Sequence, residues 1–179
     1  MTNLILHIQK NLGYPELHKI DPNTQDVKPD EKIFGTHTNA QAAIPAVICG
    51  ICSRLNSSEG VELIMAANHQ NSIDMIFGKE KTELINRIAE YSNTSNEVVC
   101  QECEHVANEA VRLIKEHLPG TGSPGDIAFF LNEQRANALL YLPASIQLGR
   151  LINDNQLDDR THKMQGPVSS LMHAVEKQF

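Results

Sequence analysis

The sequence predicts an all-α protein, an irregular bundle of roughly seven to nine helices in a single domain over residues 1–179. Apolar residues recur at helical spacing along most of the chain. No convincing pair of strands can be found, and a lone strand has nothing to pair with. The 179 residues, 41% of them hydrophobic, can bury a core without disulfides. We expect neighbouring helices to cross at ridge-into-groove angles.

The first helix is expected over residues 2–12, where leucines and isoleucines fall on one face and Thr2 can act as the N-cap. Gly13 can adopt the left-handed conformation that ends a helix. A polar, proline-containing stretch follows at about residues 21–38. We predict a loop there, because few apolar side chains could anchor it.

The most apolar segment, residues 39–55, predicts a buried central helix, since it is almost free of charge. Pro45 could stand in its first turn or form a kink, and both interpretations stay open. Residues 61–77 should be helical with an interruption near 68–72. For residues 61–67 the β-propensity is also high, so strand and helix stay open there.

Two further helices are expected in the middle of the chain. The first covers residues 82–92, where apolar side chains repeat at helical spacing. Thr94 and Glu97 then form the pattern of a capping box. In such a box the Thr94 hydroxyl accepts from the backbone amide of Glu97, and the Glu97 carboxylate accepts from the backbone amide of Thr94. This box should begin a long helix that ends at Leu118, before Pro119 and Gly120.

The C-terminal part should hold a helix over residues 127–141, a break or kink at Pro143 and a continuation to about Ile152. A charged loop at 153–165 precedes a last helix at about 167–178. Two segments, 39–77 and 98–141, share the order of helix, glycine-bearing break and helix. This order suggests two similar helical halves.

The composition disfavours several classes of function. Twenty-two acidic side chains against fifteen basic ones leave a net charge of −7. Nucleic acids and anionic membrane surfaces attract clustered Lys and Arg, so we expect neither as a partner. The N-terminus lacks the pattern of a secretory signal, and no apolar stretch approaches the roughly 20 residues of a membrane span. We therefore expect a cytoplasmic protein with reduced cysteines.

The four cysteines form two CxxC pairs, which are Cys49 with Cys52 and Cys100 with Cys103. Residues at i and i+3 share a helical face, so two crossing helices could bring all four sulfur atoms together. That ligand set would suit zinc or an iron–sulfur cluster. Alternatively, the cysteines pack as small apolar side chains in the core, because cysteine is among the most buried residues. Glu102 and His105, next to the second pair, are expected on a solvated helix face.

A family resemblance rests on three segments. Asn11–Gly13 end the first helix, an alanine-rich run lies at Gln41–Ala46, and Ile88–Ser95 precede the long helix. Over about residues 3–150 this pattern resembles the YidB-like family of bacterial all-helical proteins. Members commonly have glycine where Asn93 stands, and the cysteines have no counterpart in the family. The resemblance implies an all-helical fold and an uncharacterised function, so it supplies no catalytic residues.

The sequence shows no acid, base and nucleophile at a spacing typical of a catalytic site. We therefore predict a soluble, non-catalytic helical protein that binds a protein partner or self-associates as a homo-oligomer. One alternative is a metal- or redox-linked protein that uses the four cysteines. Another is an enzyme with a small-molecule pocket between its helices. No catalytic or cofactor-binding residue is assigned, and zinc or iron–sulfur belongs to the cysteine alternative alone.

Overall fold

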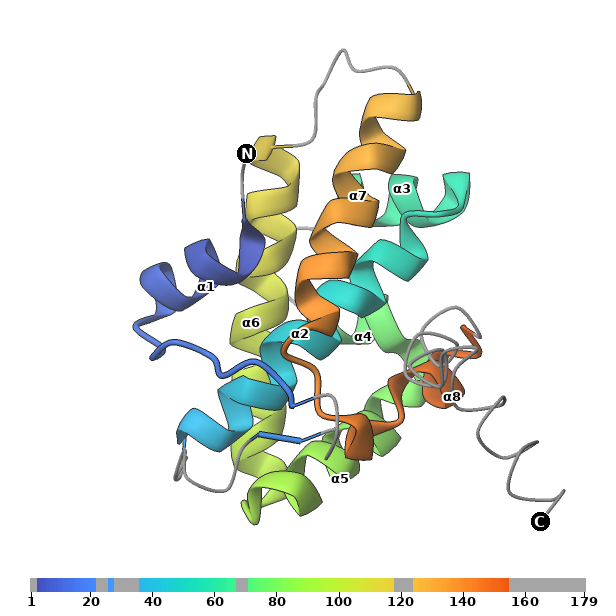
Figure 1. The fold of residues 1–179 in the computed structure, drawn as a ribbon. Helices are drawn as coiled ribbons and strands as arrows, with labels where there is room; N and C mark the ends of the chain where they lie inside the picture. The colour runs from blue at the N-terminus through green and yellow to red at the C-terminus, as the bar shows by residue number, and fades with distance from the viewer. Residues whose placement is uncertain (1–2, 22–25, 28–35, 67–70, 118–123, 155–179) are drawn as a thin grey trace, which may run out of the picture.

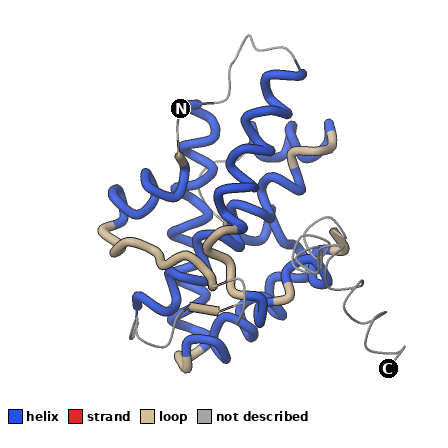
Figure 2. Tube along the Cα trace, in the orientation of Figure 1, coloured by secondary structure: helices blue, strands red, loops and turns tan. Residues whose placement is uncertain are grey.

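In the computed structural model the protein is an all-α bundle, as the sequence predicts (Figure 1). The structure describes residues 3–21, 26–27, 36–66, 71–117 and 124–154. Within these ranges there are eight α-helices and two short 3-10 helices. The described residues contain no β-strand, and a single antiparallel bridge joins Asp21 to Asp26 (Figure 2).

Helix α1 (Leu4–Leu12) confirms the first predicted helix. Its N-cap is Asn3, whose side-chain oxygen accepts from the amides of Ile5 and Leu6. Thr2, the expected cap, lies outside the described residues. Gly13 ends the helix with φ 72°, the left-handed conformation that favours glycine.

Helix α2 (Thr36–Arg54) forms the centre of the bundle (Figure 1). It begins earlier than predicted, so residues 36–38 are helical and not part of the expected loop. Every residue from Asn39 to Cys52 is buried, as expected for a helix that is apolar on all sides. Pro45 stands in the helix interior, nine residues after its start, which excludes the first-turn interpretation.

The segment whose character the sequence left open is helical. Residues 61–66 belong to helix α3 (Ser58–Ala66), so the strand alternative is wrong for them. Helix α4 (Ser72–Phe77) and the 3-10 helix η1 (Gly78–Glu80) follow. Helix α3 also begins before the predicted position, because the Ser57 hydroxyl accepts from the Gly60 amide and caps it. Part of the expected interruption, residues 67–70, lies outside the described residues.

Helices α5 (Lys81–Ser92) and α6 (Asn96–His117) confirm the two helices predicted in the middle of the chain. The predicted capping box is wrong: the cap is Ser95, whose Oγ accepts from the Val98 amide, while the Thr94 hydroxyl donates to Ser92 O. Asn93 ends α5 with φ 53°, which explains why glycine would also suit that position.

Helix α7 (Pro124–Leu139) ends before the predicted boundary at 141. Pro143 marks a break: the chain continues as the 3-10 helix η2 (Ala144–Ile146) and then the short helix α8 (Leu148–Ile152). The predicted loop at 153–165 beyond Asp154 and the C-terminal helix at 167–178 lie outside the described residues. The internal duplication also relies on residues 68–70, which are outside them too.

The helices are arranged around α2, with α6 and α7 forming its largest packing partners and α5 closing one end (Figure 1). Two buried glutamines tie the start of α1 and two loops to this core. Gln134 Oε1 accepts from the Leu4 amide at 3.0 Å, and Gln41 bonds the backbone of both His18 and Tyr141. Such bonds satisfy backbone groups that would otherwise be buried unpaired. Among the described helices, none is long and apolar enough to cross a membrane.

Candidate functional site

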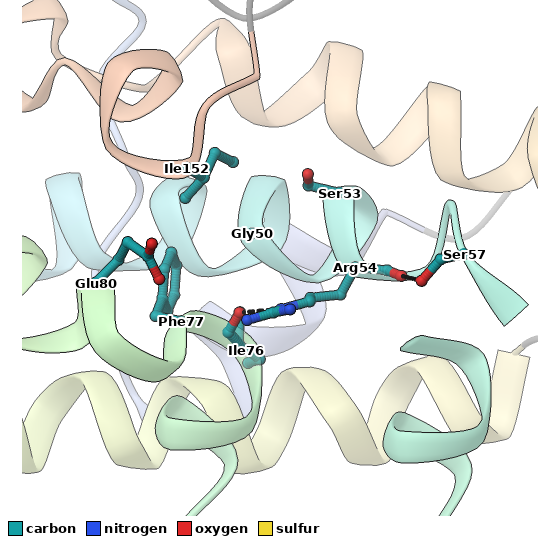
Figure 3. Close-up of a pocket in the computed structure, with 8 residues that line it drawn as sticks. All are labelled: Gly50, Ser53, Arg54, Ser57, Ile76, Phe77, Glu80 and Ile152. Carbon is teal, nitrogen blue, oxygen red and sulfur yellow. Dashed lines mark hydrogen bonds between the residues drawn. The ribbon is translucent and has the colours of Figure 1, made fainter. Parts of the chain in front are cut away.

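A small hollow of about 240 Å³ lies where the end of α2 meets α4, η1 and α8 (Figure 3). Its polar lining comes from α2, the turn after it and η1. These polar residues are Ser53, Arg54, Ser57 and Glu80. Its apolar lining consists of Gly50, Ile76, Phe77 and Ile152. This concave surface brings together a cation, an anion, hydroxyls and an aromatic ring.

Arg54 is held in place by a single bond within the hollow. Its Nε donates to the carbonyl oxygen of Ile76 at 2.7 Å (Figure 3). Among the described residues it makes no ion pair, so its terminal amino groups are available to another acceptor. The neighbouring Ser53 is half-buried, and its hydroxyl has no hydrogen-bond partner among the residues that the structure describes.

The other two polar groups of the hollow, Ser57 and Glu80, differ in the interactions that they make with the rest of the protein. Ser57 donates to the carbonyl oxygen of Arg54 and caps α3, so its role is structural. Glu80 lies 3.7 Å from Lys79, whose side chain is 91% exposed. An ion pair with so exposed a partner contributes little. The Glu80 carboxylate is therefore open to a second cation.

The floor of the hollow depends on a glycine. A Cβ atom on Gly50 would lie 2.5 Å from Phe77 Cζ and 2.9 Å from Ile76 Cγ2. Real Cβ atoms essentially never approach so closely. Only glycine therefore lets the Phe77 ring pack directly on α2, which closes the hollow from below.

The structure places the predicted cysteines on the two central helices, with Cys49 and Cys52 on α2 and Cys100 and Cys103 on α6. All but Cys100 are buried, and all four are free thiols. Over the described residues there is no group of three or more His, Cys, Asp or Glu side chains that could hold a metal ion. The zinc or iron–sulfur alternative thus has no support from the geometry and stays a prediction.

Burial also opposes thiolate formation. It raises the pKa of Cys49, and it raises the pKa values of Cys52 and Cys103 to about 12. Arg135 partly offsets the effect at Cys49 and Cys52 because its positive charge favours the thiolate. Since the thiolate is the reactive form, burial makes these three thiols weak nucleophiles.

A buried ion pair lies beside the first cysteine pair. Arg135 Nη2 is 3.0 Å from Asp154 Oδ2, and the two side chains are only 10% and 14% exposed. The contact links α7 to the residues that follow α8. Because Nη2 makes no well-oriented hydrogen bond, the contact is chiefly electrostatic.

The expectation that Glu102 lies on a solvated helix face is wrong, because the residue is buried. It is 7% exposed, whereas His105 is exposed as expected. Glu102 Oε2 accepts from Asn39 Nδ2 at 2.7 Å, and its carboxylate also receives the Tyr14 hydroxyl. Burial raises the pKa of Glu102, outweighing these two hydrogen bonds and the nearby His105, which lower it. Burial and the same carboxylate raise the pKa of Tyr14.

We expect the Glu102→Gln variant to retain stability better than the wild type as pH rises. The raised pKa means that the folded state holds the Glu102 proton more tightly than the unfolded state. Its stabilisation is therefore complete below the unfolded pKa of about 4.3 and is lost as pH rises through the folded value. The variant's amide keeps the acceptor for Asn39 Nδ2 and has no such pH dependence.

Urea unfolding from about pH 4 to pH 8 would measure this difference. The exposed Glu97→Gln variant is the matched control on the same helix, and it should follow the wild type. Parallel curves for the Glu102→Gln variant and the wild type would contradict the assignment of this carboxyl as a destabilising buried charge.

No protein-family model, curated protein or solved structure matches the chain. The YidB-like resemblance therefore stays a prediction. The function has to be inferred from the surfaces and side chains of this structure alone.

The sequence alone did not reveal two polar features of the fold, Arg54 in the hollow and the buried Glu102. In the sequence, Arg54 stands out only as the first charged residue after an apolar segment. Its surroundings depend on α4 and α8, which are distant in sequence. Glu102 lies one helical turn from the apolar residues Val99 and Val106, which share its face of α6, and this spacing gave a weak signal of its burial.

Proposed function

We propose that the chain is a non-catalytic module that binds another protein through the outer face of the first turns of α7. The proposal depends on the exposure of Phe129. This residue is 60% exposed, the largest exposed fraction among the large apolar residues that the structure describes. A large aromatic residue at such a position is typical of an interface anchor. The four free cysteines also fit a reducing compartment such as the cytoplasm.

The apolar character of α7 extends around the whole helix near its start. Residues 127–131 are Ile-Ala-Phe-Phe-Leu, and only Leu131 among them is buried. A helix that is apolar all round is normally covered on all sides. The chain covers α2 in this way but leaves Ala128 and Phe129 exposed. This unpartnered face is the feature that a binding partner would cover.

The charge distribution favours a basic partner over a second copy of the chain. The net charge is −7, so two copies repel each other. Glu133 lies four residues after Phe129 and hence on the same face. The described part of α7 has one basic side chain, Arg135, and it is buried in its ion pair. A partner helix with apolar anchors and flanking Lys or Arg matches this face best.

We expect the Phe129→Glu variant to bind a basic amphipathic helix at least about 10-fold more weakly than the wild type. Loss of a buried Phe side chain removes about 1.5–3 kcal/mol of binding free energy. The probe is a synthetic helical peptide of leucine and lysine, titrated at physiological salt and followed by fluorescence anisotropy. A leucine and glutamate peptide of the same pattern tests the role of charge.

The matched control is Leu6→Glu, because Leu6 on α1 is also well exposed, at 55%, and the variant carries the same added charge. It should leave binding of the lysine peptide unchanged. Equal losses in both variants would show that binding does not depend on the α7 surface and would refute the proposal. A wild-type dimer in light scattering that Phe129→Glu converts to a monomer would replace the basic partner with a second copy.

A further inference from the structure

We propose that the hollow beside Arg54 binds a small zwitterion, a short chain with a carboxylate at one end and an ammonium group at the other. This goes beyond the protein-binding proposal and is independent of it, because Phe129 does not line the hollow. The proposal rests on two opposite charges, each without a strong partner, on one small concave surface.

Arg54 provides the place for the carboxylate. The bond from Nε to Ile76 O fixes the guanidinium plane, so its terminal amino groups are held in a defined direction. Arginine's planar fork matches a carboxylate with two parallel hydrogen bonds.

Glu80 provides the place for the ammonium group. Figure 3 shows Glu80 and Arg54 at opposite sides of the hollow, with Phe77 and Ile76 between them. No ion pair joins Glu80 to Arg54, and the contact between Glu80 and Lys79 is long at 3.7 Å. A ligand that carries both charges can therefore satisfy both side chains at once.

The middle of the hollow suits a short hydrocarbon segment. Phe77, Ile76 and Ile152 supply its apolar lining. The volume of about 240 Å³ lies below the range of roughly 300–1,000 Å³ that is typical of drug-sized ligands. The expected ligand is consequently a short ω-amino carboxylate and not a nucleotide or a larger cofactor.

Calorimetric titration of the full chain with 5-aminopentanoate, pentanoate and pentylamine tests this assignment. We expect 5-aminopentanoate to bind most tightly, with a Kd of about 1 mM or below. Arg54→Gln should weaken 5-aminopentanoate and pentanoate by about 10-fold or more and leave pentylamine unchanged. Glu80→Gln should reduce 5-aminopentanoate to the affinity of pentanoate. Arg112→Gln, which alters a partly exposed arginine outside the hollow, is the control.

Amide chemical shifts locate the binding. With 5-aminopentanoate present, the signals of Gly50, Ser53 and Phe77 should move in the wild type and in Arg112→Gln but not in Arg54→Gln. Binding that is equal for the three compounds, or that survives in Arg54→Gln, would overturn the proposal. So would wild-type signals that stay in place at roughly 10 mM ligand, well above the expected Kd.

Discussion

Replacing Asp154 with alanine is expected to destabilise the folded protein by about 3 kcal/mol, the lower end of the cost of breaking a buried ion pair. The change leaves the Arg135 guanidinium, 90% buried, without its carboxylate at 3.0 Å. An uncompensated charge in such a site is far more costly than the pair itself is favourable. Urea unfolding at neutral pH, with the slope compared between variant and wild type, measures the loss.

A double-mutant cycle distinguishes the unpaired charge from simple loss of packing. Arg135→Met removes the charge while keeping a side chain of similar length, so Arg135→Met combined with Asp154→Ala should recover most of the lost stability. Additive losses in the double variant would show that Asp154 acts through other contacts. Arg150→Met, an exposed arginine on α8, is the control and should change stability by less than about 0.5 kcal/mol.

Truncating Phe77 to alanine is expected to cost about 3–5 kcal/mol, the range for removing a buried aromatic side chain. Phe77 is 1% exposed, and its ring packs directly on the backbone of α2 at Gly50. The cavity that remains would also open the floor of the hollow beside Arg54. Denaturant unfolding gives the stability change, and calorimetric titration with 5-aminopentanoate reports whether the hollow still binds.

The reciprocal variant tests the same contact from the other helix. Gly50→Ala should destabilise the protein despite alanine's helix propensity, which favours it by about 1 kcal/mol. The added methyl group would lie 2.5 Å from Phe77 Cζ, and such overpacking costs about 1–3 kcal/mol. Combining Gly50→Ala with Phe77→Leu should cost less than the two changes separately. A stabilised Gly50→Ala variant would contradict the close contact.

The helices that hydrophobic periodicity predicted are confirmed where the local signal was strong. Helix α6 shows this best, since its apolar stripe and the turn residues before it set its limits closely. Boundaries were less predictable: Ser95 caps α6 in place of Thr94, and α2 extends back to Thr36. Capping depends on which side chain meets an unpaired amide, and neighbouring Ser and Thr residues satisfy the pattern almost equally.

The candidate sites could not be predicted in the same way. Glu102 is buried because Tyr14 and Asn39, from two other segments, reach its carboxylate. The hollow exists because α4 and α8 meet the end of α2 around Gly50. Periodicity describes which face of a helix is apolar but does not say which distant segment covers it.

The sequence by itself determined the all-α class, most of the helices and the need to bury residues 39–52, because these follow from local spacing and hydrophobicity. Only the tertiary structure decided that Cys49, Cys52 and Cys103 are buried thiols, that Phe129 stays exposed and that Arg54 faces a hollow with Glu80. Exposure and pairing depend on contacts between residues far apart in the chain, and the free energy of each contact exists only once the helices have packed.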